Sequence, residues 1–75
     1  MSFNTEQIEA CREYLGEYGI EFFQGLHESE GTLLSAHLRE GMAVRNFMRE
    51  SGLFSLDCHW LDDNWMLLVL KVIQV

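Results

Sequence analysis

The residues best suited to chemistry in this chain are an arginine within a helical pattern and two consecutive aspartates further along. Arg45 falls on the same helical stripe as the apolar Leu38 and Met42, so its guanidinium must be paired or must reach water. Asp62 and Asp63 offer carboxylates that a guanidinium can grip through two parallel hydrogen bonds. The spacing predicts a structural link between the second and third helical segments. An anionic ligand on Arg45 and an unpaired, snorkelling Arg45 are the alternatives.

A second group of potential ligands lies in a loop-like segment. Asp57, Cys58 and His59 are adjacent, and His27 and His37 could approach from elsewhere. Zinc sites usually contain a ligand pair at C-x2–4-C or H-x3–5-H spacing, and the sequence contains no such pair. We therefore expect no metal and no other cofactor, and we interpret these side chains as solvated loop residues.

Nucleophilic catalysis has little support in the sequence. Cys58 with His37 or His27 would form a cysteine–histidine pair, but no family signature surrounds it. A glycine-rich phosphate loop, G-x-S-x-G and H-E-x-x-H are all absent. Cys11 falls on the apolar face of the first helical segment, where we expect a small core side chain. We predict that the chain is not an enzyme; a small enzyme or metal protein using His37, Cys58 and His59 is an alternative.

Residues 37–46 contain the pattern H-x3-G-M-x-V-R-N, in which Gly41 is the glycine, and Asp62–Trp65 then form D-D-x-W. Together these motifs resemble a pattern in small uncharacterised bacterial domains, where a helix carrying the first motif is followed by a loop and by a helix that starts at the second. The resemblance covers under half of the chain. It implies a helical third segment and implies no activity.

The first helical segment has a clear start. Asn4 is a good N-cap, and Gln7 stands three residues later, as a capping box requires. The apolar spacing that follows predicts a helix of about four turns that ends near Gly16 or Gly19. Residues 20–26 are interpreted as a connector whose phenylalanines fill the core.

The second helix is predicted to be the longest. Ser29 or Thr32 can cap its start, and Gly52 marks its end. Gly41 would lie inside this helix, where glycine costs roughly 1 kcal/mol relative to alanine. Such a glycine is either tolerated or permits the close approach of another helix.

The third segment decides the fold class. Asp62 is expected to cap a third helix, yet residues 66–75 are nearly all apolar and also have good strand propensity. We predict an all-α fold, a compact three-helix bundle in which residues 1–75 form a single domain. The alternative is an α+β fold with residues 66–75 as a strand, paired with residues 20–26 or with a second chain.

Composition and charge narrow the choice of partner. The chain has 75 residues, 48% of them hydrophobic, and a formal net charge of −7. Because affinity for nucleic acid and for anionic membranes comes largely from lysine and arginine, we expect neither as a partner. Two cysteines are too few for a disulfide scaffold, and the N-terminus lacks the features of a signal peptide. The longest apolar stretch, Trp65 to Leu70, is far below the ~20 residues that span a bilayer. We therefore predict a cytoplasmic protein.

The third segment carries more apolar surface than one helix face can hide. We expect a non-enzymatic protein-interaction module that docks on a protein partner or associates with itself, most simply as a C2 homodimer through the apolar C-terminal segment. The alternative is an acidic inhibitor or immunity-type protein, which covers a basic site on a partner by charge mimicry.

Overall fold

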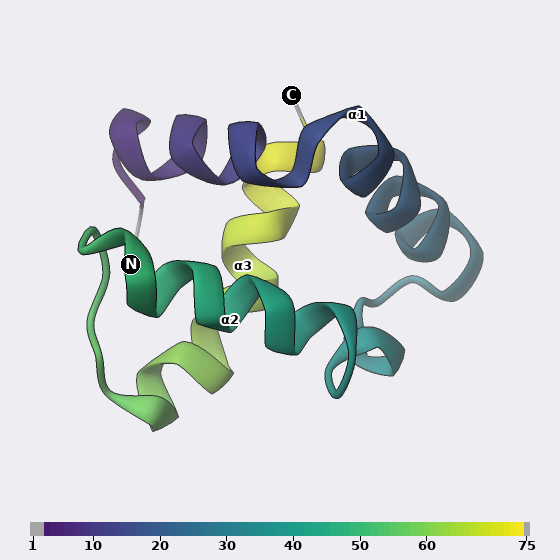
Figure 1. Ribbon diagram of the computed structural model, residues 1–75. Coiled ribbons are helices and arrows are strands. Elements are labelled where there is room, and N and C mark those ends of the chain that lie inside the picture. Colours follow the sequence, from purple (N-terminus) through teal and green to yellow (C-terminus); the bar gives the residue numbers. More distant parts are fainter. Residues whose placement is uncertain (1–2, 75) are drawn as a thin grey trace.

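A computed structural model describes residues 3–74 of the chain. Within this range it contains three α-helices and one short 3₁₀ helix: α1 (Thr5–Glu30), η1 (Leu34–Ala36), α2 (Glu40–Ser51) and α3 (Cys58–Ile73). The helix α3 runs through the middle of the molecule, and α1 and α2 both pack on it (Figure 1). Since residues 3–74 contain no strand, the predicted all-α three-helix bundle is confirmed.

The capping box predicted at the start of α1 is present. The side chain of Asn4 accepts a hydrogen bond from the backbone N–H of Gln7 at 2.8 Å, and the side chain of Gln7 accepts one from the backbone N–H of Asn4 at 2.9 Å. The helix is interrupted at Gly16, whose φ of 66° and ψ of −176° are accessible almost only to glycine. The chain changes direction there, as Figure 1 shows, and helix resumes at once.

The expectation that residues 20–26 form a connector is wrong, because they continue α1 as far as Glu30. Their apolar side chains recur at three-residue spacing, which buries Phe23 and packs Ile20 and Leu26 against the core. The helix ends only at Gly31, which adopts a left-handed conformation with φ of 72° and donates its N–H to the carbonyl of His27.

The second predicted helix begins later than expected. Neither Ser29 nor Thr32 caps α2, because Ser29 still belongs to α1 and Thr32 accepts a hydrogen bond from the N–H of Leu34 at the start of η1. The helix α2 begins at Glu40 and ends, as predicted, before Gly52, whose φ is 75°. Gly41 therefore lies in the first turn of α2 rather than in its interior.

The third helix begins earlier than expected. Its N-cap is Asp57, whose carboxylate accepts hydrogen bonds from the N–H groups of His59 at 2.8 Å and Trp60 at 3.2 Å. Asp62 is therefore not a cap and lies inside the helix, since no helix-breaking residue separates it from Asp57.

The apolar end of the chain is helical because α3 is contacted from two sides. A helix that is hydrophobic around most of its circumference is stable when its neighbours cover it, and α1 and α2 both do so here. The α+β alternative is therefore wrong for residues 66–74, and Val75 lies outside the described residues. Among residues 3–74 the core comprises twelve buried apolar residues: Cys11, Phe23, Leu33, Ala36, Val44, Met48, Leu61, Trp65, Leu68, Val69, Val72 and Ile73.

Candidate functional site

Arg45 lies where the sequence predicted, between α2 and α3. The residue is only 6% exposed, and its Nε is 3.2 Å from Oδ1 of Asp62. The contact is a single one rather than the two parallel hydrogen bonds expected. The Asp62 side chain is 49% exposed, so water also solvates this carboxylate. The neighbouring Asp63 is exposed.

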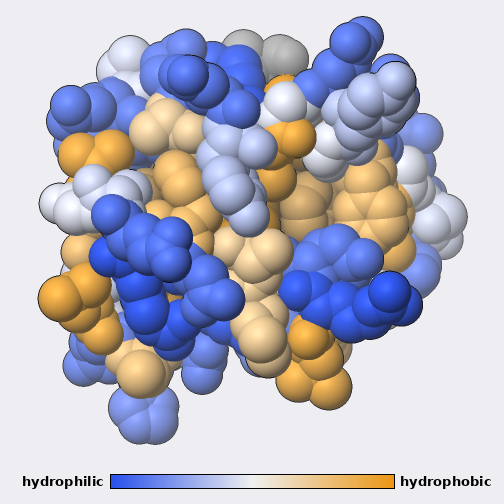
Figure 2. All heavy atoms as spheres, viewed as in Figure 1, coloured by the Kyte–Doolittle hydropathy of each residue, from blue (hydrophilic) through white to orange (hydrophobic). Residues whose placement is uncertain are grey.

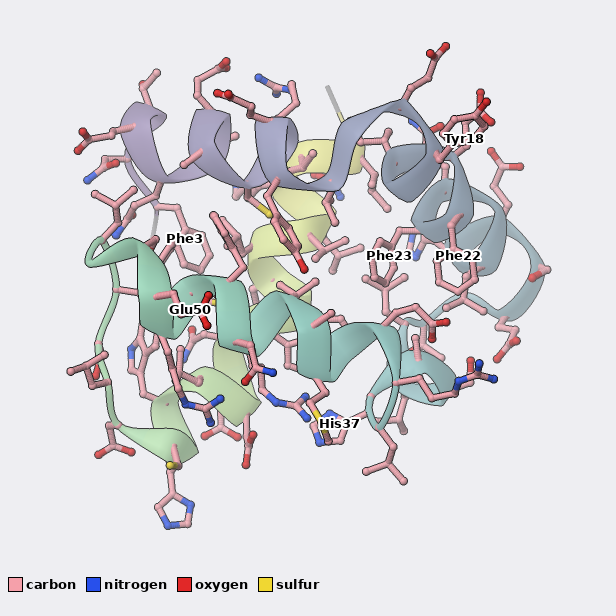
Figure 3. The ribbon with its side chains drawn as sticks, viewed as in Figure 1. Phe3, Tyr18, Phe22, Phe23, His37 and Glu50 are labelled. Atoms are coloured by element: carbon pink, nitrogen blue, oxygen red, sulfur yellow. The ribbon has the colours of Figure 1, made fainter. Side chains whose placement is uncertain are left out.

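His37 receives the remaining contacts of this cluster. Its Nδ1 lies 3.2 Å from Nη1 of Arg45 and 3.1 Å from Nε1 of Trp65. A guanidinium and an indole N–H can only donate, so Nδ1 must be the acceptor and the ring proton must be on Nε2. Figure 3 shows His37 beside the first part of α2. From the sequence, His37 or His27 was an alternative partner for Cys58; in the structure Nδ1 of His37 contacts Arg45 and Trp65.

Trp65 connects this polar cluster to the core. Its side chain is fully buried, and Cζ of Arg45 lies 5.9 Å from the centroid of its ring, within the range of a cation–π contact. The ring also covers Gly41, where a Cβ atom would lie 2.5 Å from Cζ2 of Trp65. The close approach that a glycine at this position permits is therefore that of a tryptophan ring.

The motif residues thus form one contiguous structural unit. His37, Gly41 and Arg45 approach Asp62 and Trp65, and the hydrogen bonds of the cluster join the η1–α2 connection to α3. The polar contacts of Arg45 and His37 in this cluster are made within the chain and connect α2 with α3. We call these five residues the latch.

The other candidate residues do not assemble into a ligand set. Among residues 3–74, no three His, Cys, Asp or Glu side chains are grouped so that they could hold a metal ion. Cys58 is exposed at the first residue of α3, where its Sγ lies 4.0 Å from Nη2 of Arg49. His59 is exposed beside it, and Nδ1 of His27 is buried without a hydrogen-bond partner.

Cys11 is a core residue, as the sequence predicted. It is fully buried, and this burial raises the pKa of its thiol to about 12, despite the opposing effect of the Arg12 charge. The thiolate is the reactive form of cysteine, so Cys11 is unsuited to nucleophilic chemistry at neutral pH.

A feature that the sequence did not predict is a groove between α1 and α2. It has a volume of about 490 Å³ and opens to solvent. Hydrophobic atoms line the space between the two helices, and hydrophilic residues border it (Figure 2). We call this feature the α1–α2 groove. Its lining residues are Tyr14, Leu15, Tyr18, Gly19, Phe22, Phe23, Glu40, Ala43 and Val44.

Three large aromatic side chains of the groove are exposed to solvent instead of being buried in the core. Tyr18 is 87% exposed, Tyr14 46% and Phe22 44%. Figure 3 shows Phe22 and Phe23 between the second half of α1 and α2, with Tyr18 closer to the kink. The sequence predicted that the phenylalanines of residues 20–26 fill the core; Phe23 does so, whereas Phe22 is exposed.

The geometry of the groove follows from Gly16 and from one aromatic contact. Tyr14 stacks on Phe47, with ring centroids 4.6 Å apart and an interplanar angle of 15°, and its hydroxyl donates to the carbonyl of Ala43 at 3.3 Å. This contact joins α1 to α2 just before the kink. Beyond Gly16 the second half of α1 takes a different direction, and the groove lies between it and the start of α2 (Figure 1).

Comparison with known proteins provides no relative from which a role could be transferred. No protein-family model, no curated protein and no solved structure matches the chain. Among the described residues, no helix combines the length and the apolar character that crossing a bilayer requires.

Proposed function

We propose that this chain is a non-enzymatic protein-interaction module that docks a partner segment in the α1–α2 groove. The observation that carries the proposal is the exposure of Tyr14, Tyr18 and Phe22 along one concave apolar surface. Contiguous exposed apolar patches on small proteins mark interaction sites. Aromatic side chains supply much of the binding energy at protein interfaces, because they bury large areas with few rotatable bonds.

The rest of the molecule fits a scaffold for such a surface. The latch residues Arg45 and His37 bond to one another and to α3 instead of presenting unpaired groups to a substrate. The helix α3 supplies a fixed support on which both walls of the groove rest. A rigid support favours binding because less conformational freedom is lost when the partner docks.

Self-association through the C-terminal segment is less favoured than docking in the groove. Much of the apolar surface of α3 is already used, since Trp65, Leu68, Val69 and Val72 are buried within the chain. Leu67, at 49% exposure, is the exposed large hydrophobic residue that α3 offers in the described part of the chain. A homodimer there would bury little additional apolar area, whereas the groove offers three aromatic residues.

The proposal is tested with a double variant of the groove, Tyr18→Ser/Phe22→Ser. The matched control is Leu34→Ser/Leu38→Ser, which changes two exposed apolar residues outside the groove lining. Proteins that co-purify with each form from the native cell are identified by mass spectrometry. Each one is then titrated against the purified chain by calorimetry.

We expect a directly binding partner whose affinity falls by at least about tenfold in the groove variant and by less than about twofold in the control. Circular dichroism at increasing temperature verifies that both variants remain folded. Partners that lose affinity equally in the two variants would contradict the proposal, as would partners that the groove variant still binds normally. Sedimentation equilibrium of the wild-type chain at micromolar concentration tests self-association separately.

A further inference from the structure

Given the proposed function, we infer that the occupant of the α1–α2 groove is a basic amphipathic helix of a partner protein. The first argument is shape. The walls of the groove are helices, and residues 3–74 provide no strand edge to which an extended peptide could add. A helix laid in an apolar groove instead inserts side chains at i, i+3 or i+4, and i+7.

The second argument is the charge along the α1 wall. Glu17 and Glu21 immediately precede the groove residues Tyr18 and Phe22, and both glutamates are exposed. Neighbouring positions of a helix differ by about 100° in direction, so Glu17 and Glu21 form a separate stripe that runs along one side of the aromatic stripe. The aromatic stripe of α1 is therefore accompanied by an acidic one.

The α2 wall is acidic as well. Glu40 is itself part of the groove lining, and helical spacing places Ala43, Phe47 and Glu50 on the same stripe of α2. Glu40 is the carboxylate of the lining on α2, and Glu50 lies further along the same stripe, beyond the lining residues. Glu50 is visible on α2 in Figure 3, toward the end away from His37. The lining contains neither lysine nor arginine.

This arrangement selects a cationic partner over a second copy of the chain. An amphipathic helix with lysine or arginine beside its apolar face could bury that face between the walls while its charged ends reach the glutamates. A second copy carries the same net charge of −7, so association would bring like charges together. Long-range attraction to a basic helix would also speed its association.

The test uses three pools of synthetic helical peptides. In all three pools, positions i, i+3, i+4 and i+7 are apolar and vary among Leu, Ile, Met and Phe. The pools differ in the positions that flank these residues. The basic pool has Lys and Arg there, the second pool has Gln, and the third has Glu. Each pool is selected against the immobilised wild-type chain at 0.15 M salt. Fluorescence anisotropy then gives the affinity of the recovered peptides for the wild-type chain and its variants.

Three double variants separate groove contacts from general attraction. The double variant Tyr18→Ser/Phe22→Ser removes apolar anchors, and Glu17→Gln/Glu21→Gln removes two adjacent charges. The control Glu30→Gln/Asp63→Asn also removes two exposed charges, but at residues that are not next to a groove residue in the sequence. We expect the basic pool to yield the binders, with affinity reduced at least about tenfold by the first variant and severalfold by the second. The control variant should bind within about twofold of the wild type.

The possible outcomes distinguish this inference from the proposed function. Groove-dependent binders from the Gln or Glu pool would overturn the basic partner but leave the interaction module intact. If no pool yields a peptide sensitive to Tyr18→Ser/Phe22→Ser, both proposals fail. If Glu17→Gln/Glu21→Gln and its control lowered the peptide affinity equally, the binding would be non-specific charge attraction, and the inference of a basic helix in the groove would be wrong. A wild-type dimer that dissociates in the groove variant would assign the groove to a second copy.

Discussion

The ring of Trp65 lies so close to Gly41 that a Cβ atom on Gly41 would be 2.5 Å from Cζ2 of the ring. Trp65 is fully buried and also donates its indole N–H to His37, so it cannot move aside without breaking that hydrogen bond. Since Gly41 lies in the first turn of α2, this contact sets how closely α2 approaches α3.

We predict that Gly41→Ala lowers the free energy of unfolding by about 1–3 kcal/mol, the usual range for overpacking a well-filled core. The matched control is Gly25→Ala, because Gly25 is also helical and a Cβ there would meet no atom within 4 Å. In the control the higher helix propensity of alanine should raise stability by up to roughly 1 kcal/mol. Urea unfolding measures both. Equal effects of the two substitutions would show that Trp65 does not restrict position 41.

The local signals in the sequence predicted the helical boundaries only where one residue was the obvious choice. The capping box of Asn4 and the glycine end at Gly52 depend on nearest neighbours, and both are present. The start of α3 was missed because Asp57 and Asp62 are equally good N-caps in the sequence, and only the packing of the intervening turn favours the earlier one. The end expected near Gly16 or Gly19 was wrong, because Gly16 marks a kink after which α1 continues to Glu30.

The candidate site likewise contains some contacts that the sequence could predict and others that it could not. The pairing of Arg45 with Asp62 was predictable, because a charged residue on an apolar stripe requires a partner. The acceptor role of His37 was not, since it depends on the 3₁₀ turn that brings residue 37 to the tryptophan. The groove was not predictable either. Whether a stripe such as Tyr14, Tyr18 and Phe22 is buried depends on the direction that the chain takes after Gly16, and this direction is a tertiary property.

We predict that His37→Phe destabilises the protein by about 1–3 kcal/mol, because the substitution removes the acceptor of two donors. Nε1 of Trp65 and Nη1 of Arg45 would both lose a hydrogen bond in a partly buried setting. The control His59→Phe alters an exposed imidazole, and the cap contact of residue 59 uses its backbone N–H. Thermal and urea unfolding of the two variants give the comparison. A His37→Phe protein as stable as the control would show that the hydrogen bonds to Nδ1 contribute nothing.

For Arg45 we predict that the conservative change Arg45→Lys costs more stability than removing the charge of its partner by Asp62→Asn. Lysine cannot contact Asp62 and His37 at once, and it lacks the planar group that lies over Trp65, so we expect a loss of about 1–3 kcal/mol. Asp62 is half exposed, so Asp62→Asn should cost at most about 1 kcal/mol. The reverse order in urea unfolding would identify the ion pair, rather than the contacts to His37 and Trp65, as the main contribution of Arg45.

The two cysteines should differ sharply in reactivity and in their effect on alkaline stability. The exposed Cys58 should react rapidly with a disulfide reagent at pH 8, whereas the buried Cys11, whose pKa is raised to about 12, should react only on unfolding. Since this pKa in the folded chain exceeds the ordinary thiol pKa of 9.0, the folded chain retains a proton that the unfolded chain loses. The contribution of Cys11 is therefore complete below pH 9 and is lost as the pH rises toward 12. We predict that stability declines less steeply from pH 9 to pH 11 in Cys11→Ala than in Cys58→Ala, as measured by urea unfolding; parallel declines would mean that the buried thiol is not responsible.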